Sequence, residues 1–146
     1  MSFKGTVLRS LPLWLAAAWF MSLTTLGFFV VPMLFANLPS PAIAGGMAAK
    51  LFAAQTAISA ACALLLVLVA RSTDAGLPDA LAQSIAMWAL GGALLALLVQ
   101  FGVSPRIIAR ENLALWHGLG SAMYFVQWVC SLVTFGKLTR FATASP

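Results

Sequence analysis

The only histidine of the 146 residues, His117, lies in the segment WHGLGSAMYF (116–125), among mostly apolar residues. An imidazole in such a place can ligate a metal or haem, carry protons, or be held by hydrogen bonds in a packed interior. The chain has no second histidine for bis-histidine haem ligation. Met123 is the one methionine of the same apolar run, and Glu111 is the only acid near His117 in the sequence. Structural and functional roles for His117 therefore both stay open.

Other reactive residue types do not form a known catalytic or metal-binding pattern. Cys62 and Cys130 lie inside apolar runs without C-x-x-C spacing, which is typical of buried thiols rather than zinc ligands. The sequence contains neither a serine–histidine–acid set nor a glycine-rich phosphate loop. We therefore predict a non-enzyme without metal or cofactor, and we keep haem or copper binding at His117 as the alternative.

The composition is that of a membrane protein. Hydrophobic residues make up 62% of the chain, charged residues make up 8%, and the mean hydropathy is +1.01. Soluble domains contain about 45–50% apolar and about 25% charged residues. So few charges could not cover a soluble surface, so we predict one integral membrane domain over 1–146. The net charge of +5 comes from dispersed Lys and Arg residues, which indicates membrane orientation rather than nucleic-acid binding.

Four apolar segments are long enough to cross a bilayer, which takes about 20 residues. We predict spans at about 11–35, 51–70, 80–101 and 113–135. A single helix over 41–70 would be about 45 Å long at about 1.5 Å per residue, which is too long for one straight span. We therefore expect residues 41–50 to form a separate interfacial helix. The predicted fold is an all-α integral membrane protein, a bundle of four transmembrane helices.

The distribution of Lys and Arg predicts the orientation. With four spans, both termini and the loop 71–79 share one side of the membrane. That side carries five basic residues, Lys4, Arg9, Arg71, Lys137 and Arg140. The other side carries three, Lys50, Arg106 and Arg110. Because basic residues favour the cytoplasmic side, we predict a multi-pass protein of the cytoplasmic (inner) membrane with both termini in the cytoplasm.

Polar residues gather toward the opposite face, where spans two and four begin and span three ends. Topology places seven of them there: Lys50, Gln55, Gln100, Arg106, Arg110, Glu111 and His117. On the fourth span, a stripe about 120° wide carries His117, Ser121, Tyr124, Gln127 and Ser131. Polar groups are costly against lipid, so we expect this stripe to face the interior of the bundle, with His117 at its outer mouth. The resulting candidate functional cluster is Lys50, Gln55, Gln100, Arg106, Glu111, His117, Tyr124 and Gln127.

Small residues recur where helices would touch. Gly91, Gly92 and Ala96 lie in the third span, and Gly118 and Ala122 lie in the fourth. This small-xxx-small spacing is typical of closely packed transmembrane helices. We therefore expect these residues to form helix–helix contacts.

Short motifs at three places resemble the transmembrane-protein-205-like family of small multi-pass membrane proteins. They are LFANLP (34–39) with KLF (50–52), SPR (104–106) and HGL (117–119), in a resemblance over about 11–136. The resemblance implies a four-span α-helical membrane protein and supplies no reaction. The motif positions that it points to are Phe35, Leu38, Pro39, Lys50, Phe52, Pro105, Arg106, His117 and Gly118. The helix pattern is also distantly similar to the copper-resistance-D-like group, which includes a haem-dependent enzyme. This chain has a single histidine, which departs from what such a haem enzyme needs, so the resemblance does not carry the cofactor over.

The sequence thus favours a non-enzymatic membrane protein that acts in transport, cation handling or the assembly of other membrane proteins. The alternative is a haem- or copper-binding redox protein of the copper-resistance-D-like type. With so few loop residues, the chain has little soluble surface. We therefore expect its contacts to be with the lipid bilayer and, laterally, with a membrane protein or a second copy of the chain.

Overall fold

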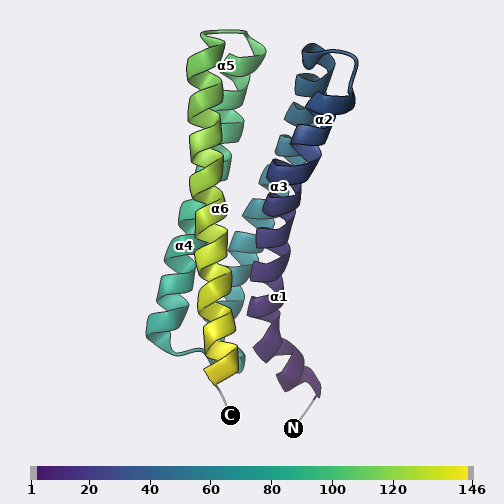
Figure 1. Ribbon diagram of the computed structural model, residues 1–146. Coiled ribbons are helices and arrows are strands. Elements are labelled where there is room, and N and C mark those ends of the chain that lie inside the picture. Colours follow the sequence, from purple (N-terminus) through teal and green to yellow (C-terminus); the bar gives the residue numbers. More distant parts are fainter. Residues whose placement is uncertain (1–2, 145–146) are drawn as a thin grey trace.

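The computed structural model describes residues 3–144, and within this range every regular element is a helix. Successive helical rods run in alternating directions, so that both ends of the described chain lie at the same end of the bundle (Figure 1). Four helical segments are long and apolar enough to cross a membrane: Arg9–Asn37, Pro41–Ala70, Asp79–Ile108 and Leu113–Ala144. The predicted all-α bundle of four transmembrane helices is therefore confirmed.

Short irregular turns divide two of the four rods into pieces. The first rod joins α1 (Phe3–Thr25), the π-helical η1 (Leu26–Val30) and α2 (Val31–Asn37). The second rod is α3 (Pro41–Ala70), which the short 3₁₀ turn η2 (Thr73–Ala75) follows. The third joins α4 (Asp79–Leu98), the π-helical η3 (Val99–Val103) and α5 (Ser104–Ile108), and the fourth is α6 (Leu113–Ala144).

Local chemistry explains where the helices begin and turn. The Ser40 hydroxyl accepts a hydrogen bond from the Ile43 amide at 3.3 Å, and proline follows it at the first helical position of α3. Asn112 caps α6 in the same way, since its side-chain oxygen accepts from the Leu115 amide at 3.4 Å. Gly76 takes a left-handed φ of 63° after η2, a conformation that glycine adopts without strain.

The separate interfacial helix expected over 41–50 does not form, because α3 runs without interruption from Pro41 to Ala70. Nothing in the segment breaks a helix: Gly45 and Gly46 lower helix propensity but keep helical geometry, and Ala44 and Ala48 are buried against the bundle. The other three rods have about the same length as α3. They extend together beyond the thickness that a single span needs.

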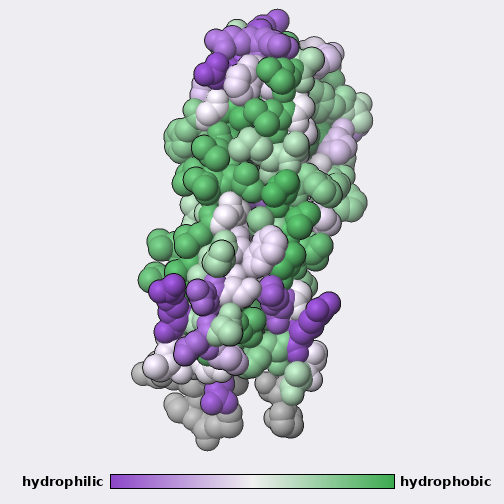
Figure 2. Space-filling model, turned by 90° about the vertical axis from the view of Figure 1, so that its left-hand side faces the viewer, coloured by the Kyte–Doolittle hydropathy of each residue, from purple (hydrophilic) through white to green (hydrophobic). Residues whose placement is uncertain are grey.

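The buried apolar core lies mostly in the half of the bundle that carries the termini, where α1, α3, α4 and α6 meet. Trp19 of α1 is fully buried there, and its ring edge lies against Gly92 of α4. The buried cluster to which it belongs draws on all four helices, and its other members are mostly small or aliphatic, among them Ala16, Leu23, Ala63, Leu66, Ile85, Ala89 and Cys130. Large apolar side chains such as Trp14, Met87 and Phe101 instead point outward. Figure 2 shows hydrophobic side chains over the middle of one face, with hydrophilic ones at its top and in its lower part.

At the opposite end, which we call the α2/α5 end, α2 packs on α3 and α5 packs on α6. The first two rods (α1–α3) form one helical hairpin and the last two (α4–α6) form another. The two hairpins stand apart at the α2/α5 end and approach each other toward the termini (Figure 1). The small residues follow this division. Gly92 and Ala96 are buried between helices as expected, whereas Gly118 and Ala122 are exposed on the part of α6 near the α2/α5 end.

Candidate functional site

A cluster of amide and hydroxyl groups crosses the centre of the bundle and joins three helices. We call Ser22, Gln55, Ser59 and Gln127 the amide–hydroxyl cluster. The Gln55 Nε2 group donates to the Ser22 oxygen at 3.0 Å and to the Ser59 oxygen at 3.4 Å. The Gln127 Nε2 group donates to the same Ser59 oxygen at 2.8 Å. The cluster therefore ties α1, α3 and α6 together through side-chain hydrogen bonds.

The helical repeat explains why these residues meet. Gln55 and Ser59 are four residues apart and so share one face of α3, which is buried. Ser22 turns its own proton back to the Trp19 carbonyl at 2.8 Å, so its oxygen is free to accept from Gln55. Gln127 lies on the buried face of α6, and its exposed fraction is only 3%. Buried amides inside a membrane need such partners, because an unpaired polar group in an apolar medium is costly.

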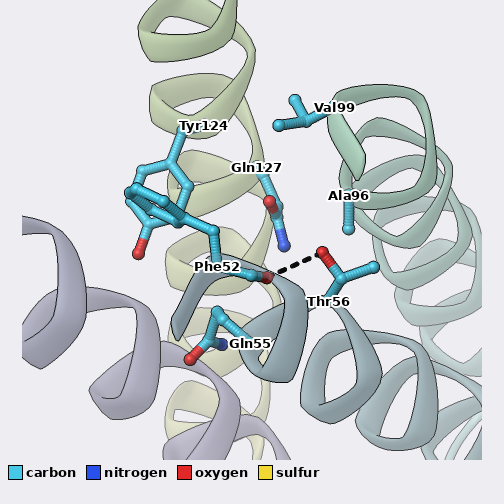
Figure 3. A pocket seen from close by; sticks show the side chains of 7 residues that line it. All are labelled: Phe52, Gln55, Thr56, Ala96, Val99, Tyr124 and Gln127. Carbon is cyan, nitrogen blue, oxygen red and sulfur yellow. Dashed lines mark hydrogen bonds between the residues drawn. The ribbon is translucent and has the colours of Figure 1, made fainter. Parts of the chain in front are cut away.

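A small cavity lies beside the cluster, between α3, α6 and the end of α4 (Figure 3). Its volume is about 10 Å³, which is about the space for one water molecule. The Thr56 hydroxyl donates to the Phe52 carbonyl on one wall. The lining residues are Phe52, Gln55, Thr56, Ala96, Val99, Tyr124 and Gln127. A cavity of this size cannot hold an organic substrate, and the hydrogen bonds beside it tie α1, α3 and α6 together.

Tyr124 anchors α6 to the π-helical turn of the first rod. Its hydroxyl donates to the Leu23 carbonyl at 2.8 Å and also faces the Gly27 backbone. In an unbroken α-helix the Leu23 carbonyl would accept from the Gly27 amide, so the phenol reaches the helix where its hydrogen-bond ladder changes. The ring can come this close because Gly27 has no side chain. One turn along α6, the Trp128 indole donates to the Thr24 oxygen at 2.9 Å.

The polar residues of the α2/α5 end form a second, separate group at the surface. Arg106 reaches Glu111 at 3.5 Å, with both side chains more than half exposed, and its guanidinium lies 4.7 Å from the centre of the Trp116 ring. These contacts fasten α5 and its loop to the start of α6. Ion pairs this exposed contribute about 0–1 kcal/mol, so the group does little to stabilise the fold.

The remaining predicted site residues do not join either group. Lys50 is exposed and Gln100 is half-buried, and among residues 9–73 and 75–144 the structure gives neither of them a side-chain hydrogen bond or ion pair. His117 is exposed as well, as is Ser121, so the prediction that this stripe faces the interior holds only from Tyr124 onward. At the α2/α5 end, α5 and η3 pack on α6, but the hairpin of α1–α3 stands apart (Figure 1), and the face of α6 that carries His117 and Ser121 stays exposed.

Among the described residues, no three of His, Cys, Asp or Glu lie close enough together to hold a metal ion. Cys62 and Cys130 are both free and buried in the apolar core. They pack there as small hydrophobic side chains.

Several residues that build the site were not predicted. Ser22, Ser59 and Thr24 supply the hydroxyl groups to which the predicted amides and Trp128 donate. The spacing of Ser59 four residues after Gln55 was a usable signal. Trp19 is a different case: its indole N–H is buried and has no hydrogen-bond partner in the described part of the chain.

The fold and the buried cluster together define an α-helical, four-span membrane protein whose central polar groups serve helix association. The chain belongs to the family described as Domain of unknown function (DUF4149), whose match covers residues 14–115. The match runs from α1 to the first residues of α6, so it includes both π-helical turns. Comparisons with curated proteins and with solved structures give no match.

Proposed function

We propose that this chain is a non-enzymatic membrane protein that assembles laterally with another membrane-embedded helix through the exposed start of α6. The observation that carries the proposal is a polar stripe with partners along only half of its length. Within this stripe Tyr124 hydrogen-bonds to α1 and Gln127 hydrogen-bonds to α3. His117 and Ser121 continue the same stripe but are exposed, without a covering helix. A partner helix placed beside them would extend the existing interface.

The side chains around this stripe suit helix–helix contact. We define the α6 face as Ala114, His117, Gly118 and Ser121, which fall within about 100° of one another at about 100° per residue. All four are exposed, and no atom lies within 4 Å of the position that a side chain at Gly118 would occupy. Small residues allow backbones to approach closely in membranes, and Ser and His side chains can hydrogen-bond across such an interface.

The chemistry of the interior supports a role in assembly over transport or catalysis. The described buried polar residues are neutral: Gln55, Ser59, Gln127, Ser131 and Thr134. Charge-coupled transport and proton relays rely on ionisable residues in the membrane interior. The resemblance to the transmembrane-protein-205-like and copper-resistance-D-like groups stays a prediction. The haem that the second group implies is tested by a visible spectrum of the purified protein.

Site-specific photo-crosslinking tests the proposal. A photoreactive phenylalanine analogue at Ser121 is expected to form one defined adduct in intact membranes, because it would face the partner helix. The same analogue at Leu119 is the matched control, because it is exposed at the same depth and lies about 160° away around α6. Gly118→Leu should abolish the Ser121 adduct without loss of folded protein, since the substitution meets nothing within this chain. Equal adducts at both positions, or an adduct that survives Gly118→Leu, would refute the proposal.

We also propose that both termini face the cytoplasm, on the basis of the five-to-three distribution of Lys and Arg. A cysteine at Thr73, in the turn on the side of the termini, should react in intact cells only with permeant thiol reagents. A cysteine at Ala109, in the turn after α5, should also react with impermeant reagents. Both positions are exposed, and the native Cys62 and Cys130 are buried, so they form a silent background. The reverse labelling pattern would invert the orientation.

A further inference from the structure

A second cavity opens at the end of the bundle that carries the termini, between the end of α3 and the start of α4. Its volume is about 460 Å³, within the range of about 300–1,000 Å³ typical of small-molecule sites. Its floor and walls combine apolar and polar side chains: Ala70, Arg71, Ser72, Thr73, Leu77, Asp79, Ala82 and Gln83. None of these residues belongs to the amide–hydroxyl cluster or to the α6 face.

The position of this cavity is that of a membrane–water boundary. One span ends at Ala70 and the next begins at Asp79, so the cavity lies where two apolar helices leave the membrane. Lipid headgroups occupy this depth. The exposed side chains that continue into the membrane are apolar. Leu68 lies three residues before Arg71, and Met87 lies four residues after Gln83, so each shares a helix face with a lining residue of the cavity.

The cavity presents one positive and one negative side chain that do not neutralise each other. Arg71 and Asp79 are both exposed, and among residues 9–73 and 75–144 the structure pairs neither with an opposite charge. Asp79 also lies in the first turn of α4, where a carboxylate is favourable with or without a ligand. Among the same described residues the guanidinium of Arg71 has no comparable partner, and Thr73 adds an exposed hydroxyl to the same cavity.

We propose that this cavity binds the phosphoethanolamine headgroup of a membrane lipid. Arg71 and the Thr73 hydroxyl would bind the phosphate, because a guanidinium presents several N–H donors to phosphate oxygens. The Asp79 carboxylate would accept hydrogen bonds from the primary ammonium group. The acyl chains would follow the apolar faces that carry Leu68 and Met87. A zwitterionic headgroup with a primary amine matches both charges, whereas glycerol headgroups lack the cation and choline headgroups lack N–H donors.

Native mass spectrometry of the full-length protein tests this site with three lipids of identical acyl chains: phosphatidylethanolamine, phosphatidylglycerol and phosphatidylcholine. We expect phosphatidylethanolamine to be retained best. Arg71→Gln should reduce retention of all three by roughly tenfold, since it removes a charge-assisted contact to the shared phosphate. Asp79→Asn should reduce retention of phosphatidylethanolamine alone, to the level of phosphatidylcholine.

Matched controls separate the site from general charge effects. Arg140→Gln removes an exposed positive charge at the same end, and Glu111→Gln removes a negative charge at the other end; neither should change lipid retention. Circular dichroism of each variant checks that the helices are intact. Equal retention of the three lipids by the wild-type chain would overturn the proposal, as would equal losses in Arg71→Gln and Arg140→Gln. Displacement of the lipid by an equal concentration of soluble phosphoethanolamine would also overturn it, because a lipid site gains from the acyl chains.

Discussion

Gly92→Ala is expected to lower the free energy of unfolding by about 1–3 kcal/mol, the range for overpacking a tight core. A Cβ at this position would lie 2.6 Å from Cη2 and 2.7 Å from Cζ2 of Trp19, and 3.3 Å from the Cβ of Cys130. Trp19 cannot swing aside, because it is fully buried among the four helices. The substitution must therefore push α1 and α4 apart. Thermal unfolding in detergent, followed by circular dichroism, measures the loss.

The neighbouring glycine is the control for this prediction. Nothing lies within 4 Å of a Cβ placed at Gly91, so Gly91→Ala should leave stability unchanged or raise it by about 0.5–1 kcal/mol through helix propensity. A Trp19→Phe background should recover part of the loss at Gly92, because the smaller ring frees the contested space. If Gly91→Ala and Gly92→Ala had equal stability, the expected steric conflict between residue 92 and Trp19 would be disproved.

The sequence predicted Gly91, Gly92 and Ala96 as contact residues but could not separate the two adjacent glycines. Neighbouring positions on a helix point about 100° apart, so only one of them can face a given partner. Which one does depends on how the helix is rotated in the bundle. That rotation follows from the packing of large residues such as Trp19 on another helix, and a local spacing rule does not contain it.

The same distinction explains which parts of the candidate site could be predicted. Hydropathy alone predicted the four spans, because each span is apolar over its own length. An even number of spans then places both termini at the same end of the bundle. The periodicity of α6 also placed Tyr124 and Gln127 on one face, and both contact other helices. His117 belongs to the same stripe but is exposed, because burial depends on whether a neighbouring helix reaches that height. The divergence of the hairpins at the α2/α5 end is a property of their packing and leaves no mark in the local pattern.

The hydroxyl partners were the hardest part of the site to predict. Serine and threonine are common in transmembrane helices and often bond their own backbone, as Thr134 does with the Cys130 carbonyl at 2.8 Å. Ser59 differs only because two amides from different helices converge on its oxygen. That convergence requires α3 and α6, which lie diagonally opposite each other in the bundle, to face each other at matching heights. Only the folded structure specifies this.

Gly27→Ala is expected to cost about 1–3 kcal/mol of stability and to release Tyr124 from the π-helical turn of the first rod. A Cβ at Gly27 would lie 2.6 Å from Cε1 of Tyr124, which is ring carbon rather than a flexible chain end. The ring would have to withdraw, and its hydroxyl would then lose the Leu23 carbonyl, now 2.8 Å away. Such side-chain hydrogen bonds contribute about 0.6 kcal/mol on average in membrane proteins, so most of the expected cost is steric.

Gly102→Ala is the matched control, because Gly102 lies in the other π-helical turn and has no atom within 4 Å of its Cβ position. It should unfold at the wild-type temperature, while Gly27→Ala should unfold well below it. Two further variants separate the loss of the Tyr124 hydrogen bond from the steric conflict at Gly27. Tyr124→Phe removes only the hydroxyl and should produce the smaller loss. In a Tyr124→Leu background, where the ring is absent, Gly27→Ala should cost little more, because the two residues then no longer compete for the same space. Additive losses in that double variant would show that Gly27 is constrained by the backbone of η1 rather than by the tyrosine ring.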